Sequence, residues 1–147
     1  MRRLFKCGKV MWNNDLNKKH TQSLKEIISK FGWPTIPMVG RKASKNAWLL
    51  VQHAEHAKSF QKKCLHLMLR ALKENPKAID KKDVAFLTDR VLLAYGKKQR
   101  FGTQVKKQKN KITSLPIANK RMVDVYRAEY DLLPLADYLA LFENDKR

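Results

Sequence analysis

Residues 80–96 read DKKDVAFLTDRVLLAYG and contain the clearest helical pattern of the chain. Val84, Leu87 and Val91 follow steps of three and four residues, so they share one face of a helix. The aspartate that opens the stretch is a common helix N-cap, and the glycine that closes it is a common C-terminal stop. The stretch therefore predicts an amphipathic helix with both of its ends defined.

Helical patterns also precede this stretch. Apolar residues three and four apart predict a first helix from Asn14 onward, which Gly32 ends. Residues 35–42 contain a proline and a glycine and are expected to form a loop. A long helical segment over 44–74 follows, with its first residue, a serine, as N-cap. Its apolar stripe changes phase near residues 57–59, which leaves a break there as an open alternative.

A basic segment follows the helix of residues 80–96. Residues 97–121 hold nine Lys or Arg residues and no acid, and a glycine and a proline interrupt them. This composition favours a loop, with a short hairpin within 105–117 as the alternative. Helical patterns return over 119–130 and, after a proline, over 135–142. The positive charge is therefore concentrated upstream of the last helices.

The chain is expected to adopt a mainly α fold. About four or five helices with few strand signals predict a compact single-domain helical bundle with one irregular basic loop. The length of 147 residues is that of one ordinary domain, so we expect one domain across residues 1–147. Residues 1–13 are expected to be a basic, less ordered N-terminal segment.

The charge balance indicates the class of partner. The chain has 32 Lys and Arg against 13 Asp and Glu, which gives a formal net charge of +19, while 44% hydrophobic residues argue against disorder. Such a field attracts polyanions, above all nucleic acid or nucleotides. The alternative is a lysine-rich surface without a specific partner. A polyanionic or phosphate-bearing partner is the expectation.

Several other classes of protein are not indicated. The two cysteines show no CxxC spacing, so neither a zinc site nor a disulfide framework is expected, and no cofactor motif is present. The N-terminal residues lack the apolar core of a signal peptide, and no stretch approaches the about 18 apolar residues of a membrane span. A cytoplasmic protein is expected, unless a specialised secretion system exports it.

Histidines provide the first candidates for chemistry. If the helix continues from Ala47, then Leu49, His53, His56 and Phe60 form one stripe, with both imidazoles on the same side. Histidine can act as a general acid or base near neutral pH. The alternative is a hydrogen-bonded histidine in the core or at its rim. No third ligand accompanies the pair, so no metal is expected.

Two charged residues interrupt the apolar pattern of the helix at 80–96. Asp89 aligns with Ala85 and Leu92, so its carboxylate is expected in an apolar region next to Arg90. A buried charge needs a partner or a ligand. One interpretation is a buried ion pair between helices. The other makes Asp89 an orienting carboxylate for a histidine and Arg90 a clamp for phosphate or carboxylate oxygens.

The loop that follows combines several groups that can bind a polar ligand. Residues 99–104 read QRFGTQ and offer amide donors, a hydroxyl, an aromatic ring and a glycine with a permissive backbone. Such a loop can wrap a ligand, although loops of this composition are also common turns.

In order along the chain, these motifs resemble a family of small bacterial proteins of unknown function. The elements that carry the resemblance are Gly32-Trp33-Pro34, Gln52-His53-Ala54-Glu55, Phe60-Gln61, Asp89-Arg90-Val91 and Gln99-Arg100-Phe101-Gly102-Thr103-Gln104, with weaker matches at Arg127 and from Leu135 to Tyr138. The resemblance implies that the polar members belong together. They form either one site or one buried hydrogen-bond network.

The leading functional hypothesis is an enzyme, a hydrolase or transferase, that acts on a nucleotide or nucleic-acid substrate. The expected catalytic residues are His53 as general acid or base with Asp89 and Glu55. The expected substrate-binding residues are Trp33, Gln52, Gln61, Arg90, Gln99, Thr103 and Gln104.

Two other functions are open. The first is a non-catalytic nucleic-acid-binding module, whose expected contacts are Lys97, Lys98, Arg100, Lys106, Lys107, Lys109 and Lys111. The second is an effector or interaction protein in which the polar motifs serve stability alone. No recognised nucleic-acid-reading motif decides between them.

Overall fold

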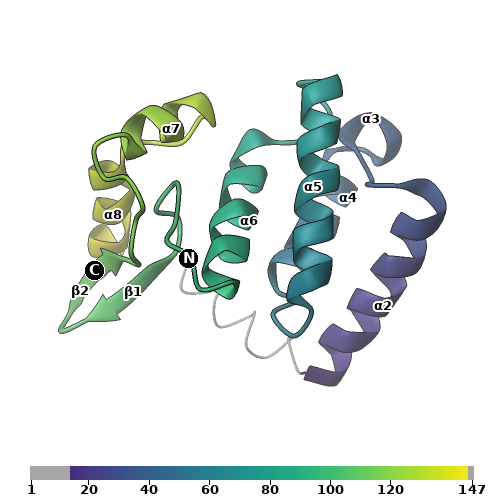
Figure 1. Ribbon diagram of the computed structural model, residues 1–147, viewed down its shortest axis with the longest axis horizontal. Coiled ribbons are helices and arrows are strands. Elements are labelled where there is room, and N and C mark those ends of the chain that lie inside the picture. Colours follow the sequence, from purple (N-terminus) through teal and green to yellow (C-terminus); the bar gives the residue numbers. More distant parts are fainter. Residues whose placement is uncertain (1–13, 146–147) are drawn as a thin grey trace. The chain divides into compact units, whose positions relative to one another are not determined.

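A computed structural model describes residues 14–145 (Figure 1). Over this range the chain forms seven helices and one two-stranded sheet, and 62% of it is helical. The mainly α prediction is confirmed, with more helices than the four or five expected. No helix in this range is both long enough and apolar enough to cross a membrane.

The described residues divide into two units, the first ending at Ile79 and the second beginning at Asp80. The prediction of a single domain across residues 1–147 stays a prediction, because each unit is described by itself. The segment 1–13 lies outside the described residues.

The first unit is built around α4, which packs against the three other helices of this unit. Their apolar faces form its core, which includes Leu24, Val51 and Met68. The bounds are α2 Asn14–Phe31, α3 Ile36–Val39, α4 Arg41–Gln52 and α5 Lys58–Glu74. The first predicted helix is confirmed.

The loop expected over residues 35–42 is wrong, because α3 and the start of α4 occupy it. Proline is tolerated in the first turn of a helix, where its missing N–H has no intrahelical partner, so Pro37 does not prevent α3. The Ile36 N–H donates to the Ala78 carbonyl oxygen at 2.8 Å, a contact that sequence patterns do not reveal. Ser44 is not the N-cap of α4 but a buried residue inside it.

The break in the long helical segment is real but begins earlier than residues 57–59. α4 ends at Gln52, and His53 is its C-cap. The side-chain Nε2 of Gln61 donates to the carbonyl oxygens of Val51 and Gln52 at 2.9 and 3.3 Å. This donor satisfies carbonyls that lose their helical partners, so the helix can end here.

The continuous stripe through Leu49, His53, His56 and Phe60 is therefore wrong. His53 and His56 lie in the turn between α4 and α5. A three- and four-residue spacing predicts a shared face only while the helix continues. In the turn, His56 is exposed and His53 is half-buried.

The second unit combines three helices with a β-hairpin. Its elements are α6 Lys81–Ala94, β1 Val105–Gln108, β2 Lys111–Ser114, α7 Val123–Glu129 and α8 Leu135–Asn144. α6 is confirmed with its predicted ends: the Asp80 carboxylate accepts from the Lys82 N–H at 3.1 Å, and Gly96 has a φ of 71° just after the helix. α8 packs against α7 and β2.

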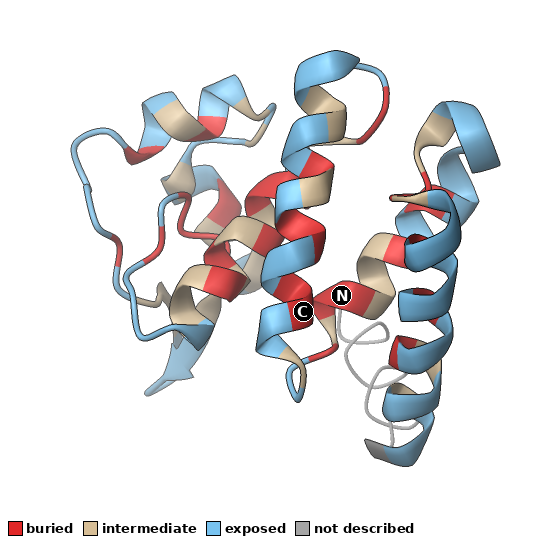
Figure 2. Cartoon of the chain, turned by 45° about the vertical axis from the view of Figure 1, so that its right-hand side comes forward, coloured by how far each residue is buried: buried red, intermediate tan, exposed pale blue. Residues whose placement is uncertain are grey.

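The hairpin alternative for the basic segment is confirmed. β1 and β2 are antiparallel, with Lys106 opposite Thr113 and Gln108 opposite Lys111. The two residues between the strands, Lys109 and Asn110, have φ values of 46° and 64°. Two positive φ values give the tight turn whose twist matches that of a hairpin. In Figure 2 the end of the hairpin is coloured as exposed.

Candidate functional site

A buried carboxylate, that of Asp89, organises the loop between α6 and β1. Asp89 is 0% exposed. Its Oδ1 accepts from the backbone N–H groups of Arg100 and Phe101 at 2.9 and 3.0 Å. Its Oδ2 accepts from the N–H and the hydroxyl of Thr103, both at 2.8 Å. Four donors fill the main acceptor positions of this carboxylate, so it holds the loop in place.

The surroundings of Asp89 also affect its protonation. Burial raises the pKa of its carboxyl group above the ordinary value, and the hydrogen bonds from Phe101, Thr103 and Arg100 oppose that shift. The donors belong to the backbone and to a hydroxyl rather than to a histidine. The assignment of Asp89 as a catalytic residue stays a prediction, and the contacts described here are structural.

Two further side chains hold the carbonyl groups of the same loop. Arg127, 1% exposed, donates from Nη1 to the Phe101 carbonyl oxygen at 2.7 Å and from Nε to that of Leu133 at 2.5 Å. The hydroxyl of Tyr138 donates to the Thr103 carbonyl oxygen at 2.8 Å. Burial lowers the pKa of Arg127 and raises the pKa of Tyr138. The loop is thus bound from both sides, by an acid and by two donors.

Sequence reasoning gave no role to Arg127 and Tyr138. They lie 23 and 34 residues beyond the end of the loop at Gln104, in helices with ordinary amphipathic patterns. The only signal was the weak family match at these positions. It carried no indication of which carbonyl groups they would bind.

Gln99 joins the two ends of the hairpin. Its Oε1 accepts from the Gln104 N–H at 2.8 Å, and its Nε2 donates to the carbonyl oxygens of Gln104 and Leu115 at 3.1 and 2.9 Å. A fourth contact joins Nε2 to the Ser114 hydroxyl at 3.3 Å. The amide adds to the backbone bond from the Leu115 N–H to the Gln104 carbonyl oxygen at 3.0 Å. Gln99 therefore has its polar groups engaged inside the unit.

Thr103 and Gln104 take part in the same network. Besides its bonds to Asp89, the Thr103 hydroxyl accepts from Gln104 Nε2 at 3.1 Å. Thr103 is buried and Gln104 is half-buried. Substrate binding by these residues stays a prediction. Their contacts explain why QRFGTQ is an ordered structural element.

Gly102 is required by both conformation and space. Its φ is 67°, and a Cβ here would lie 2.9 Å from Ile117 Cδ1 and 3.1 Å from Leu135 Cδ1. Glycine adopts this backbone most readily, and a methyl group here would require the ends of the Ile117 and Leu135 side chains to shift. The glycine lets the loop pass tightly against the segment after β2.

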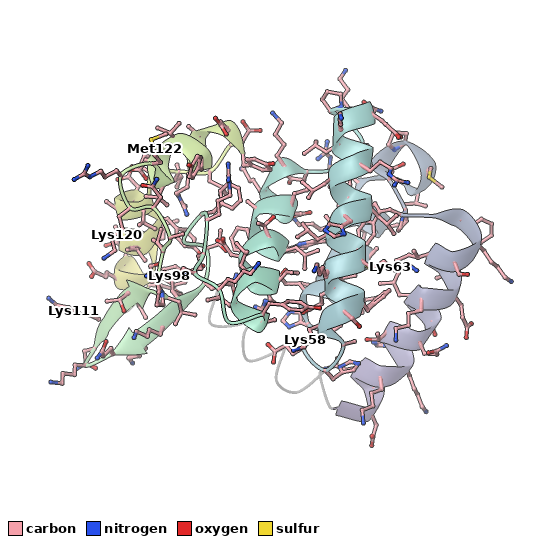
Figure 3. The ribbon with its side chains drawn as sticks, viewed as in Figure 1. Lys58, Lys63, Lys98, Lys111, Lys120 and Met122 are labelled. Carbon is pink, nitrogen blue, oxygen red and sulfur yellow. The ribbon has the colours of Figure 1, made fainter. Side chains whose placement is uncertain are left out.

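The network holds a basic surface in place. Gln99 and Ile117 form a parallel bridge: the Gln99 N–H donates to the Pro116 carbonyl oxygen, and the Ala118 N–H donates to that of Gln99, both at 2.8 Å. The two ends of the basic segment, residues 97–121, thus lie next to each other. Figure 3 labels three of its lysines, Lys98, Lys111 and Lys120.

All nine cationic residues of the basic segment are exposed. They are Lys97, Lys98, Arg100, Lys106, Lys107, Lys109, Lys111, Lys120 and Arg121. No acid within residues 14–145 forms an ion pair with any of them. An unneutralised group of this kind is available to an anionic partner.

The predicted site residues of the first unit surround the end of α4. Gln61, 1% exposed, holds the final carbonyls of this helix, as described above. Gln52 is buried and its Oε1 accepts no hydrogen bond within the described part of the chain, and the Nε1 of buried Trp33 likewise has no acceptor there. His53 and Glu55 follow Gln52 in the turn and have polar contacts.

The structure thus brings together some of the predicted site residues. Asp89, Gln99, Thr103 and Gln104 form one network in the second unit, whereas Arg90 lies half-buried on α6 with contacts of its own. In the first unit, Gln61 is bonded to the Gln52 backbone. The sequence also predicted that these residues of the first unit and those of the second belong to one site. That stays a prediction.

Other chemistry receives no support from the described residues. Within residues 14–145 no three His, Cys, Asp or Glu side chains are placed to hold a metal ion. Cys64 is fully buried on α5, and burial raises the pKa of its thiol to about 12. A thiol with so little thiolate is a poor nucleophile.

Comparison with known proteins adds one finding. Residues 9–146 match a family of unknown function, DUF6624. The chain belongs to this family. The match confirms the resemblance suggested by the ordered motifs, and it covers both units. No curated protein and no solved structure matches the chain significantly. Since the family carries no known activity, its function must be argued from the contacts described above.

Proposed function

We propose that this DUF6624 member is a non-catalytic nucleic-acid-binding protein that uses the basic segment of its second unit. One observation carries the proposal: all nine cations of residues 97–121 are exposed, and no acid in the described range pairs with them. Cations that neutralise phosphates release condensed counterions, which supplies most of the affinity of such proteins for nucleic acid.

The hairpin presents part of this charge on a rigid support. In the antiparallel register Lys106 lies opposite Thr113, and Gln108 lies opposite Lys111. Residues that are opposite each other share a face of the sheet, and so do residues two apart on one strand, so Lys106 and Lys111 lie on the same face. The Gln99 bonds close the base of the hairpin. Charges fixed in this way lose less conformational entropy on binding than charges on a free loop.

The composition of the hairpin end favours nucleic acid over a membrane surface. Residues 107–111 read KQKNK and contain no apolar side chain. Proteins that bind the membrane interface bury apolar residues among the lipids in addition to using charge. Lysine and amide side chains instead provide donors for phosphate and base oxygens.

The test measures binding of a fluorescently labelled oligonucleotide by anisotropy at several salt concentrations. A quadruple variant with Lys106, Lys107, Lys109 and Lys111 changed to Gln is expected to bind at least about tenfold more weakly. Its salt dependence is also expected to fall, by about 0.7 in the log–log slope for each lysine that meets a phosphate of a single strand.

A matched control removes the same charge from the first unit. Lys18, Lys19, Lys30 and Lys42 are exposed and form no ion pair within the described residues. Their change to Gln gives a variant with the same net charge as the hairpin variant, and it is expected to keep most of the affinity. Equal losses in both variants, no binding by the wild type, or tighter binding to anionic vesicles than to nucleic acid would contradict the proposal.

The enzyme with His53 as general acid or base is the second candidate. It is favoured by the buried Oε1 of Gln52 and Nε1 of Trp33, which have no hydrogen-bond partner among the described residues. Such atoms are rare in protein interiors, and a bound polar ligand would satisfy them. If this function holds, His53→Ala abolishes turnover of a nucleotide or RNA substrate without lowering the melting temperature. A large fall in melting temperature would instead assign His53 a structural role.

A further inference from the structure

One cation of the basic segment differs from the other eight in its contacts. The guanidinium carbon of Arg100 lies 4.0 Å from the centre of the Tyr126 ring, and 5.7 Å from that of Phe101. The first distance lies well within the about 6 Å of a cation–π contact, and it is close enough for the guanidinium to stack on the ring. Arg100 is nevertheless an exposed residue, so a ligand can reach it from solvent.

The position of Arg100 is fixed by the network beneath it. Its backbone N–H donates to Asp89 Oδ1 at 2.9 Å, and its neighbour Gln99 is held in the bridge to Ile117. Tyr126 lies on α7, half-buried. Both partners of the stack are therefore anchored before any ligand arrives, which lowers the entropy lost on binding.

The guanidinium of Arg100 and the hydroxyl of Tyr126 can both form hydrogen bonds to a ligand. No acid or carbonyl within the described residues accepts from the Arg100 guanidinium, and the Tyr126 hydroxyl has no hydrogen bond in the same range. A guanidinium stacked on a ring presents its N–H groups at the edge, where they can bind phosphate oxygens, and a flat face on which a base can stack.

We propose that Arg100 and Tyr126 form a stacking platform that makes single-stranded nucleic acid the preferred ligand of the basic segment. This inference rests on the proposed function. Bases in a duplex are stacked on each other and hide their faces, whereas unpaired bases can stack on aromatic or guanidinium planes. The lysines of the hairpin meet the phosphates of either form, so the preference comes from the platform.

The experiment compares binding of a labelled single strand with binding of the same strand in a duplex. Arg100→Lys keeps the charge and the backbone N–H that binds Asp89 but removes the flat group. It is expected to weaken single-strand binding by about fivefold or more, since stacking of one base contributes about 1 to 3 kcal/mol. Duplex affinity is expected to fall by less than single-strand affinity, because the lysine keeps the charge that meets the phosphates. The melting temperature is measured to check that the variant remains folded.

Two variants of Tyr126, one that keeps the aromatic ring and one that removes it, test the contribution of the ring. Tyr126→Phe keeps the ring under Arg100 and is expected to retain the preference for single strands. Tyr126→Leu removes the ring and is expected to lose that preference by a factor similar to Arg100→Lys, with the melting temperature measured for both variants.

The outcomes separate this inference from the proposed function. If Arg100→Lys weakens single-strand and duplex binding equally, or weakens neither, while the quadruple lysine variant still loses affinity, the platform is overturned and the basic segment remains the binding surface. If the wild type binds neither form, the proposed function itself is overturned.

Discussion

The loop of residues 99–104 and the hairpin of residues 105–114 are adjacent in the chain and use polar side chains in opposite ways. In the loop, Gln99 and Thr103 are buried and bonded to neighbouring backbone or to Asp89. In the hairpin, the lysines are exposed and no acid of the described residues pairs with them. The polar side chains of the first region are therefore bonded within the unit, whereas the cationic side chains of the second remain accessible from solvent.

Among the proposed variants, the greatest loss of stability is expected when the buried carboxylate that holds the loop is removed. Asp89→Ala removes the acceptor of four hydrogen bonds and leaves buried N–H groups without a partner. The free energy of unfolding is expected to fall by about 3 to 5 kcal/mol. Denaturant unfolding followed by circular dichroism measures it.

Asp145→Ala is the control, because Asp145 is an exposed acid of the same unit. This variant is expected to change stability by less than about 0.5 kcal/mol. A similarly small effect of Asp89→Ala would show that the network contributes little to stability.

The next effect concerns the glycine inside the loop. A Cβ at position 102 would lie 2.9 Å from Ile117 Cδ1, so Gly102→Ala requires that side chain to shift, and it also strains the backbone at a φ of 67°. We expect a loss of about 2 to 4 kcal/mol from backbone strain and overpacking together. Thermal unfolding of the variant tests this value.

Gly96→Ala isolates the backbone contribution. Gly96 has a similar φ of 71°, but a Cβ there would meet no atom within 4 Å. Its loss is expected to be about 1 kcal/mol, from the left-handed conformation alone. Equal losses at the two glycines would contradict the close approach described for Gly102.

The smallest effect on stability is expected for substitutions of the hairpin lysines. The quadruple variant of Lys106, Lys107, Lys109 and Lys111 to Gln removes exposed charges that have no ion-pair partner in the described range. The free energy of unfolding is expected to stay within about 0.5 kcal/mol per site, with any change toward greater stability because self-repulsion falls. A clear destabilisation would show that these lysines serve the fold rather than binding.

Local patterns predicted the elements whose ends are set locally. α6 was predicted with its Asp80 cap and its glycine stop, because a cap needs only residues within one turn. α3 and the end of α4 were missed, because the Ile36 bond to Ala78 and the Gln61 bonds to the α4 carbonyls join residues 9 to 42 positions apart. Spacing arguments do not extend over such separations.

The candidate sites were predictable in composition but not in role. The nine cations of residues 97–121 and the polar motif at 99–104 are visible in the sequence. That Asp89 would bind the loop backbone, and that Arg100 would stack on Tyr126, depends on where α6 and α7 lie around the loop. Residue type alone left Asp89 open to a catalytic or a structural assignment.

The helical class, the family and the strong positive charge could be predicted without coordinates, since they follow from composition, local periodicity and ordered motifs. Which polar residues hold the loop and which remain on the surface became visible in the fold alone. A buried polar group needs a hydrogen-bond partner inside the fold, and here that partner comes from distant parts of the chain. The carboxylate of Asp89 is bonded to a loop more than ten residues further along the chain, whereas the lysines of the hairpin are exposed to water.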